Sequence, residues 1–209
     1  HALNYPARFR LPGFWVNPAL NVDKLKNKKN IREIKPWPQG VYDDVVAAAN
    51  PTLRRFIIAA RNTGQRGSDV AGMKLTDYND GEVLVTQDKT DVKVWIPAPQ
   101  ELVELIAGMP KDNVLLFPNS AGRQWVASAW GSEIRKLMKK TGHEAYSLHG
   151  LRKNETIELL EADCTPDQVK VITGLITTQM IGKYGREVSK RRQGQAAIVK
   201  LEDARKNKG

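Results

Sequence analysis

Residues 147–153 have the sequence Ser147-Leu148-His149-Gly150-Leu151-Arg152-Lys153 and open a segment, 147–161, whose apolar residues recur at helical spacing. Within it, His149 and Arg152 are three residues apart, so they share one face of the predicted helix. An imidazole and a guanidinium on one face offer several hydrogen-bond donors to an oxyanion. The segment therefore predicts a helix that carries an anion-binding site.

A tyrosine follows this helix in an unusual setting. Tyr184 lies in the sequence Gly182-Lys183-Tyr184-Gly185-Arg186, between two glycines and beside two cations. Glycines and charged residues are typical of a mobile surface segment and not of a core. This setting suits a phenolic nucleophile.

A second arginine precedes the segment by about eighty residues of chain. Residues 41–63 predict two helices broken at Asn50-Pro51, and Thr63-Gly64 predicts the end of the second. Arg66 follows, at the start of a predicted short helix, 67–73, where it would be held on rigid structure at a cleft. The alternative is a surface ion pair with Asp69, which would contribute little to stability.

Residues 82–97 show the alternation of two β-strands, with a polar turn, 87–91, between them. The turn places Lys89 at the tip of a predicted hairpin, where a flexible ammonium can reach a ligand. Lys93 is the competing candidate, and a lysine at a turn is by default solvated without a function.

The remaining segments are mainly helical. Helices are predicted at 99–109 and 123–140, with a possible added strand at 114–118 between them. Thr165-Pro166-Asp167-Gln168 has the pattern of an N-cap, an N1 proline and a capping-box glutamine, so another helix begins there and ends at Gly174. A short helix then leads to Tyr184. The fold class predicted is mainly α with a small antiparallel β-sheet (α+β).

Taken in order, these residues resemble the motif set of the tyrosine recombinases, or phage-type integrases. The resemblance rests on Thr63-Gly64-Gln65-Arg66-Gly67-Ser68-Asp69, on Lys89, on His149 with Arg152, and on Tyr184. It extends from about Thr63 to Arg186, and the order of the motifs makes it more specific than any single motif.

The resemblance implies an integrase-type catalytic domain that cuts and rejoins DNA without metal or cofactor. Tyr184 would be the nucleophile, forming a 3′-phosphotyrosyl intermediate, and Lys89 would protonate the leaving 5′ oxygen. Arg66 and Arg152 would bind the non-bridging phosphate oxygens, and His149 would assist as a donor or proton acceptor. Asp69 would support Arg66.

One position departs from the family pattern. Leu175, nine residues before Tyr184, occupies the place where the family has His or Trp. Leucine can pack beside a nucleophile but cannot donate a hydrogen bond. Losing one donor to a transition state typically costs about 3 kcal/mol, or a hundredfold in rate, so the sequence predicts slower chemistry.

The charge of the chain favours a polyanionic partner. Its 209 residues carry a net charge of +10, with a pI near 9.7, and binding that neutralises phosphates releases counterions. Double-stranded DNA is the expected partner. The resemblance further implies a homotetramer on paired DNA sites, with an excisionase or a DNA-bending protein as a candidate accessory factor.

Two features of the sequence indicate the cellular compartment of the protein. A single cysteine, Cys164, excludes an internal disulfide, and no apolar run reaches the roughly 18 residues of a membrane span. We expect a cytoplasmic protein of a bacterial host, associated with the nucleoid and with no membrane partner.

Three regions are expected. Residues 1–40, rich in Pro, aromatic and Lys residues, would be an interdomain linker or wrapping segment. Residues 41–187 would be the catalytic domain, and residues 188–209 a basic amphipathic tail that either exchanges with a neighbouring protomer or caps its own domain. The start at His1-Ala2, without Met, suggests a fragment or a processed product. In the family that the chain resembles, a stretch like Asn17-Pro18 follows a DNA-clamping domain, so the resemblance implies such a domain upstream.

Two other functions remain open. A type IB topoisomerase or a telomere resolvase shares a similar set of catalytic residues. A non-catalytic DNA-binding module that has kept the fold is the alternative of a different class, and Leu175 favours it. The leading hypothesis is a site-specific recombinase that integrates or excises a phage genome or mobile element.

Overall fold

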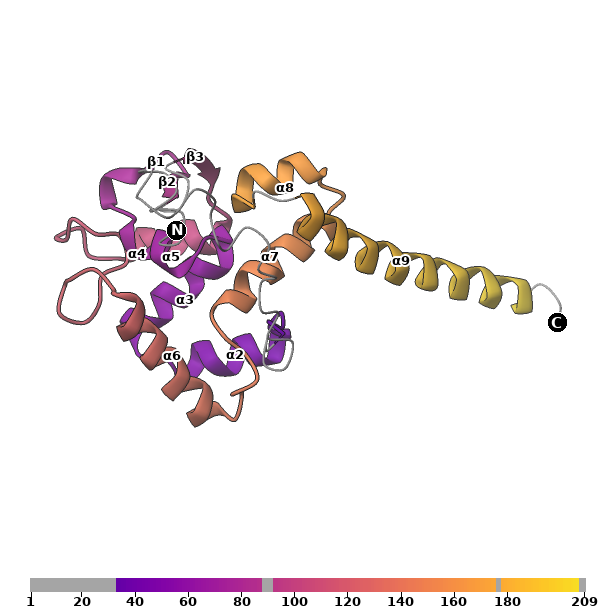
Figure 1. The fold of residues 1–209 in the computed structure, drawn as a ribbon, viewed down its shortest axis with the longest axis horizontal. Helices are drawn as coiled ribbons and strands as arrows, with labels where there is room; N and C mark the ends of the chain where they lie inside the picture. The colour runs from indigo at the N-terminus through magenta and orange to yellow at the C-terminus, as the bar shows by residue number, and fades with distance from the viewer. Residues whose placement is uncertain (1–32, 88–91, 176–177, 207–209) are drawn as a thin grey trace, which may run out of the picture. The chain divides into compact units, whose positions relative to one another are not determined.

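The structure, a computed structural model, describes residues 33–87, 92–175 and 178–206. All of these except Glu33 belong to the unit Ile34–Gly209. The described part is mainly helical with one small sheet (Figure 1). This confirms the predicted fold class.

Two helices, α2 (Gln39–Ala48) and α3 (Pro51–Thr63), begin the described unit. Between them the side chain of Asn50 accepts a hydrogen bond from the backbone N–H of Leu53 at 2.9 Å, and Pro51 occupies the first turn of α3. At the other end Gly64 stops α3 with φ 62°, a left-handed conformation that glycine adopts without strain. The predicted break and stop are thus confirmed.

The core is organised around α3. Its residues Phe56 and Ile57 are fully buried, and the ring of Phe56 lies 5.7 Å from that of Trp125 and 6.1 Å from that of Trp130, between centroids. Burying aromatic rings of this size contributes much of the stability of a small domain.

The sheet has three antiparallel strands in the order β1 (Tyr78–Asn79), β2 (Glu82–Gln87) and β3 (Val92–Pro97). The inner face buries Val83, opposite Ile96, and the outer face carries Thr86, opposite Lys93. The hairpin is therefore confirmed, and the two-residue β1 is an addition to it. Between α3 and the sheet lie α4 (Gly67–Gly72) and the short 3-10 helix η2 (Leu75–Asp77).

Helix α5 (Gln100–Ala107) follows the sheet, and α6 (Ala127–Thr141) begins four residues later than predicted. The delay has a local cause, because the side chain of Asn119 accepts hydrogen bonds from the backbone N–H groups of Ala121 and Arg123 and holds a turn there. Residues 114–118 do not form an added strand of the sheet. Leu115 makes only an isolated bridge to Lys74, and Leu116 and Phe117 are buried in the core instead.

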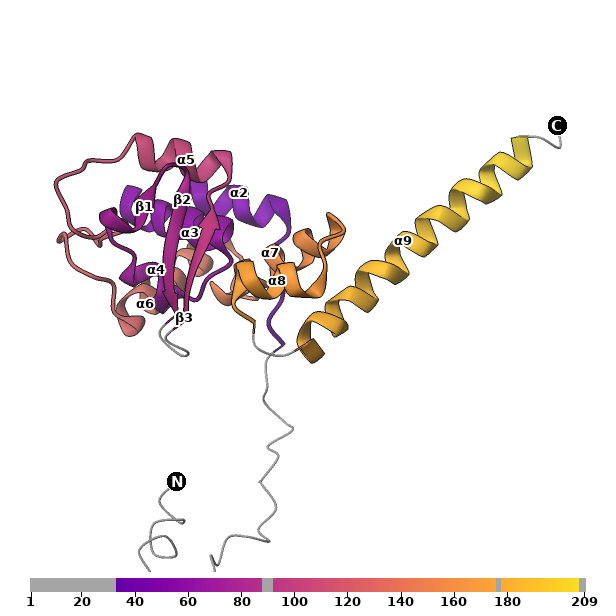
Figure 2. The ribbon, with the colours of Figure 1, turned by 90° about the horizontal axis from the view of Figure 1, so that it is seen from above.

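The last three helices are α7 (His149–Glu161), α8 (Pro166–Thr173) and α9 (Thr178–Lys206). Helix α7 contacts α3 as well as α8 and α9, so it connects the last two helices to the core helix α3 (Figure 2). Helix α8 begins with the predicted capping box, in which Thr165 and Gln168 each accept a hydrogen bond from the other's backbone N–H.

Helix α9 is continuous over 29 residues, whereas the sequence predicted a short helix up to Tyr184 and a separate amphipathic stretch. Its early residues Ile181 and Val188 are buried, and residues 189–206 are exposed. Arg191 pairs with Glu161, and Arg192 with Asp163, so the middle of α9 is tied to the end of α7. No helix in the described ranges is long and apolar enough to cross a membrane.

Residues 34–37, here called the strap, cross the start of α7. The backbone N–H of Trp37 donates to the side-chain oxygen of Asn154 at 2.7 Å, and the Asn154 amide donates back to the Trp37 carbonyl at 2.8 Å. The indole N–H of Trp37 donates to the carbonyl of Ser147 at 2.7 Å. These three bonds fasten the strap to the helix that carries His149 and Arg152.

Candidate active site

Arg66 is the N-cap residue of α4, directly after the turn that ends α3. The buried carboxylate of Asp69 accepts a hydrogen bond from the Arg66 backbone N–H at 3.2 Å and lies 3.5 Å from Nη1 of the Arg66 side chain. The same carboxylate therefore holds both the backbone and the guanidinium of Arg66. The pair predicted as a surface alternative exists, but its acid is buried, so it is a fixed part of the site.

Arg152 reaches the same turn from α7. Its side chain is only 3% exposed, and its Nη1 donates a hydrogen bond to the carbonyl of Gly64 at 2.9 Å. Because Gly64 is two residues from Arg66, this bond brings the two arginines to one place. The sequence predicted both residues, and the bond that brings them together joins Arg152 to Gly64 across 88 positions of the chain.

Each arginine keeps a buried N–H group that has no hydrogen-bond partner among the described residues. These groups are Nη1 of Arg66 and Nη2 of Arg152. Burial, and then the positive charge of Arg66, lower the pKa of Arg152 to about 10, while Asp69 opposes this shift. Two close, partly desolvated cations with unsatisfied donors are the arrangement that an oxyanion would stabilise. We call this pair of side chains the arginine clamp.

His149 is the first residue of α7 and shares its face with Arg152. Although the residue is largely exposed, partial desolvation of the ring, followed by the charges of Arg152 and Arg66, lowers its pKa below the ordinary value of 6.5. This shift favours the neutral form of the imidazole. A neutral imidazole has one donor and one acceptor nitrogen, so it can donate to an oxyanion or accept a proton.

Tyr184 lies half-buried in α9, against α7. The Nζ atom of Lys153 is 4.8 Å from the centroid of its ring. A cavity of about 200 Å³ adjoins the ring, lined also by Ile157 and Glu161 of α7 and by Glu187, Val188 and Arg191 of α9. Since Lys153 is the residue directly after Arg152, the ring packs against α7 next to one member of the arginine clamp, but on a different face, because successive residues of a helix point about 100° apart.

Two of the predicted site positions, Leu175 and Lys89, are not among the side-chain donors that the structure describes. Leu175 is half-buried and follows Gly174, whose φ of 62° ends α8, and its N–H donates to the Thr173 hydroxyl at 3.4 Å. Its side chain has no donor. Lys89 lies outside the described residues, which stop at 87 and resume at 92.

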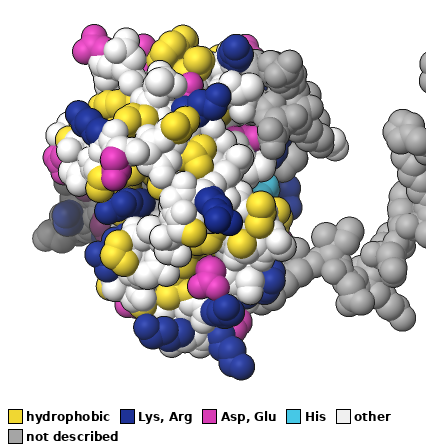
Figure 3. Space-filling view, turned by 90° about the vertical axis from the view of Figure 1, so that its left-hand side faces the viewer, with side chains coloured by type: hydrophobic (Ala, Val, Ile, Leu, Met, Phe, Trp, Pro, Cys, Tyr) yellow, Lys and Arg dark blue, Asp and Glu magenta, His cyan; other side chains and the backbone are white. Residues whose placement is uncertain are grey.

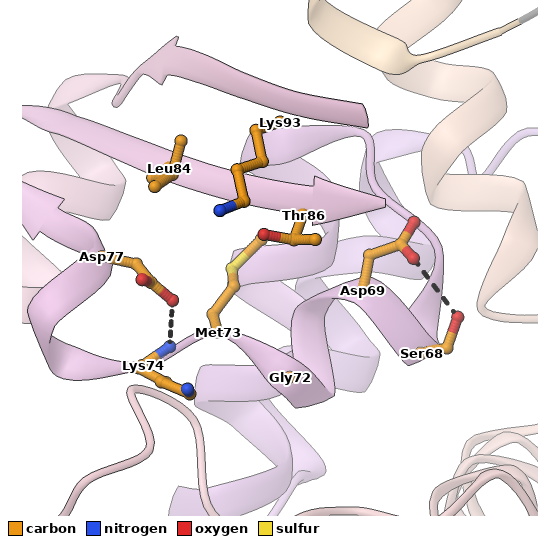
Figure 4. A pocket seen from close by; sticks show the side chains of 9 residues that line it. All are labelled: Ser68, Asp69, Gly72, Met73, Lys74, Asp77, Leu84, Thr86 and Lys93. Atoms are coloured by element: carbon orange, nitrogen blue, oxygen red, sulfur yellow. Dashed lines mark hydrogen bonds between the residues drawn. The ribbon is translucent and has the colours of Figure 1, made fainter. Parts of the chain in front are cut away.

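Lys93, the second lysine of the hairpin, lines a cavity of about 330 Å³ on the sheet side of α4 (Figure 4). Figure 4 shows its side chain extending over the cavity beside Thr86, with Asp69 of α4 on the same cavity wall. Lys93 therefore lines the same cavity as Asp69, the residue that holds Arg66. The other lining residues are Ser68, Gly72, Met73, Lys74, Asp77 and Leu84.

Gln65 was not singled out from the sequence. It is 2% exposed, and its amide nitrogen donates to the carbonyls of Ile172 at 2.6 Å and Thr63 at 3.1 Å. It therefore ties α8 to the turn that carries Arg66. Its position beside Arg66 was the only signal available in the sequence.

The charged side chains at the surface and the groups that could hold a metal ion help to determine whether an anionic ligand can bind. On the face shown in Figure 3, Lys and Arg side chains are spread widely, with fewer Asp and Glu side chains between them. Within the described ranges, no group of three or more His, Cys, Asp or Glu residues could hold a metal ion.

The fold is a mainly helical domain in which two arginines, Arg66 and Arg152, reach the same turn. The sequence model of the phage integrase family matches residues 39–191, and the chain therefore belongs to this family. This confirms the resemblance to the tyrosine recombinases.

Individual relatives are similar over part of their length. The integrase of Enterobacteria phage P21 is 33% identical over 88 residues, which cover 41% of this chain and 22% of that protein. Among solved structures, a lambda integrase dimer bound to a COC′ core site matches with a TM-score of 0.66 at 20% identity, covering 88% of this chain and 56% of that one. The XerA recombinase matches with a TM-score of 0.64 at 19% identity, covering 78% and 66%. The chain thus spans about a fifth of the phage P21 integrase and just over half of the lambda integrase chain.

Proposed function

We propose that this chain is the catalytic part of a site-specific DNA recombinase that cuts and rejoins DNA through a 3′-phosphotyrosyl intermediate. The observation that carries the proposal is the arginine clamp, in which Nη1 of Arg66, ion-paired with Asp69, and Nη2 of Arg152 are buried and have no hydrogen-bond acceptor among the described residues. Two guanidiniums can offset the charge that develops on a phosphate under attack. The net charge of +10 supports DNA as the ligand.

In the proposed reaction, the phenol oxygen of Tyr184 attacks the scissile phosphorus. A bond forms between this oxygen and phosphorus, and the bond from phosphorus to the 5′ oxygen breaks. Lys89 gives a proton to the leaving 5′ oxygen, and the phenol proton passes to His149 or to water. Rejoining is the same reaction in reverse, with the 5′-hydroxyl of a partner strand as the nucleophile.

The clamp, His149 and Asp69 have separate roles in this scheme. Arg66 and Arg152 bind the non-bridging oxygens, and Asp69 holds Arg66 in place through the contacts described above. In its neutral form, His149 is suited to donate to the phosphate or to accept the phenol proton. Lys93 is the alternative to Lys89, because it lines a cavity that Asp69 also lines.

The wider assignment follows the family. Residues 41–187 would be the catalytic domain, 1–40 a linker or wrapping segment and 188–209 a tail that exchanges between the protomers of a homotetramer on paired DNA sites. The solved structures of similar fold include a lambda integrase tetramer bound to a Holliday junction. The biological task would be to integrate or excise a phage genome or mobile element. It would take place at the nucleoid of a bacterial host, with an excisionase or a DNA-bending protein as partner.

A trapping assay tests the proposal. The full chain is incubated with nicked suicide duplexes of randomised sequence, denatured, and any protein–DNA adduct is mapped by mass spectrometry. We expect an adduct on Tyr184, and Tyr184→Phe should abolish it while DNA binding is retained. An adduct on another residue would refute the assignment of the nucleophile.

A non-catalytic DNA-binding module is the second candidate, because Leu175 lacks the donor that the family has at this position. It would be favoured if neither the natural chain nor Leu175→His gave an adduct although both bound DNA.

A further inference from the structure

Lys153 makes contacts that join three distant segments of the chain. It follows Arg152 on α7, and its Nζ is 4.8 Å from the centroid of the Tyr184 ring in α9. The same ammonium donates a hydrogen bond to the carbonyl of Ile34, in the strap, at 3.4 Å. Its position is therefore set by the strap on one side and by the ring on the other.

The carbonyl of Ile34 belongs to a segment that is held firmly. Trp37, three residues later, exchanges two hydrogen bonds with Asn154 and donates a third to Ser147. Because Asn154 is next to Lys153, the strap is fastened beside the lysine. The ammonium thus has a fixed acceptor, which limits the positions that its long side chain can take.

The Tyr184 ring also adjoins a cavity that is lined by residues of α7 and α9. Ile157 and Val188 are apolar residues of the cavity that the ring adjoins, and Val188 is buried. A cation near an aromatic face is attracted by the ring quadrupole. The ring therefore adjoins apolar residues as well as the ammonium of Lys153, the residue that directly follows Arg152 of the arginine clamp.

We propose that Lys153 is a positioning residue that holds the phenol ring of Tyr184 on α7 and thereby sets how often its hydroxyl reaches the phosphate. The inference rests on the proposed function of Tyr184 as the nucleophile. Restricting the ring before the reaction reduces the freedom that must be lost on attack. Lys153 acts through Tyr184, so its loss affects the rate of cleavage and not the affinity for DNA.

The kinetic test compares Lys153→Met, Lys153→Arg and a control, Lys140→Met, which removes one positive charge from the exposed end of α6. The rate of adduct formation is measured at saturating suicide duplex, and the Kd for the duplex is measured separately. We expect Lys153→Met to lower the rate about fivefold, the size of a cation–π contact, with a Kd equal to that of Lys140→Met. Lys153→Arg should restore the rate, because a guanidinium also stacks on an aromatic ring.

A second measurement requires no activity. The full chain is labelled with 3-fluorotyrosine, and the ¹⁹F resonance of Tyr184 is assigned by its absence in Tyr184→Phe. Lys153→Met should shift this resonance in the DNA-free protein and leave the other tyrosine resonances in place, whereas Lys140→Met should shift none.

These two measurements separate the possible failures. An unshifted Tyr184 resonance, or an unchanged rate at saturating DNA, overturns the role of Lys153. A raised Kd with an unchanged rate also overturns it and makes Lys153 a contact to the DNA backbone. If the natural chain gives no adduct but the resonance shifts, the proposed function fails while the hold of Lys153 on the ring is supported.

Discussion

Arg152 and Gly64 are joined by a hydrogen bond of 2.9 Å from the guanidinium of the first to the carbonyl of the second. The bond links the middle of the fold, α7, to the turn from which Arg66 extends. It uses the N–H group on one side of the guanidinium and leaves Nη2 buried without a partner among the described residues. The turn that ends α3 thereby sets the position of both cations.

Replacing Arg152 by lysine should remove this link and one half of the clamp. Lysine keeps the charge but cannot bond the Gly64 carbonyl and a phosphate oxygen through one planar group. We expect adduct formation at saturating duplex to fall on the order of a hundredfold. The measurement is a single-turnover rate, with Arg135→Lys on the exposed face of α6 as the matched control. A rate within a few-fold of the natural chain would refute the role of Arg152.

Leu175→His should raise the rate of cleavage. The substitution adds a donor at the position where the family has one, and such a donor is worth about a hundredfold in rate. The rate of adduct formation is compared with that of Val171→His, which places a histidine on the exposed surface of α8. Equal or slower cleavage by Leu175→His would contradict the alignment of residues 174–184 with the family pattern.

Gly150→Ala should displace the strap. A Cβ atom at this position would lie 2.3 Å from the carbonyl oxygen of Lys35 and 2.7 Å from the ring of Trp37, so backbone must move. We expect a loss of about 1–3 kcal/mol in the free energy of unfolding, measured with urea.

The control for this substitution is Gly131→Ala in α6. A Cβ there would meet only the end of the Arg135 side chain, at 3.5 Å, and alanine is the better helix former by about 1 kcal/mol. The two glycine substitutions should therefore change the stability in opposite directions. Equal effects would show that the close approach of the strap to Gly150 does not affect the free energy of unfolding.

Glu155 should make stability depend on pH. Burial raises its pKa to about 7, although Arg61, at 3.3 Å, opposes the shift. Because the folded state holds the proton more tightly than the unfolded state, this group stabilises the fold most below about pH 4.5, and that contribution is lost as the pH rises through 7.

Glu155→Gln removes this titration. The stability of the variant relative to the natural chain should rise between pH 5 and pH 8, by at most about 1.4 kcal/mol per pH unit. Urea unfolding at several pH values measures the difference. A difference that stayed constant across this range would contradict the raised pKa.

Elements that depend on neighbouring residues could be predicted from the sequence. The Asn50 cap and the Thr165–Gln168 capping box join residues three apart, and the β2–β3 hairpin follows from the alternation of its apolar residues. The pairing of His149 with Arg152 on one face likewise follows from helical geometry. The start of α6 was missed because the turn at Asn119 competes with the first residues of the predicted helix.

The contacts that assemble the site join residues far apart in the chain, and local spacing carries no information about them. Arg152 meets Gly64 across 88 positions, and Trp37 meets Asn154 across 117. The sequence predicted Arg66, Arg152 and Tyr184 as site residues by type and order, because their chemistry is a property of the side chains. Tertiary packing determined which N–H groups of the arginines stay buried and unpaired and that Lys153 covers the Tyr184 ring, because burial and orientation depend on which helices meet.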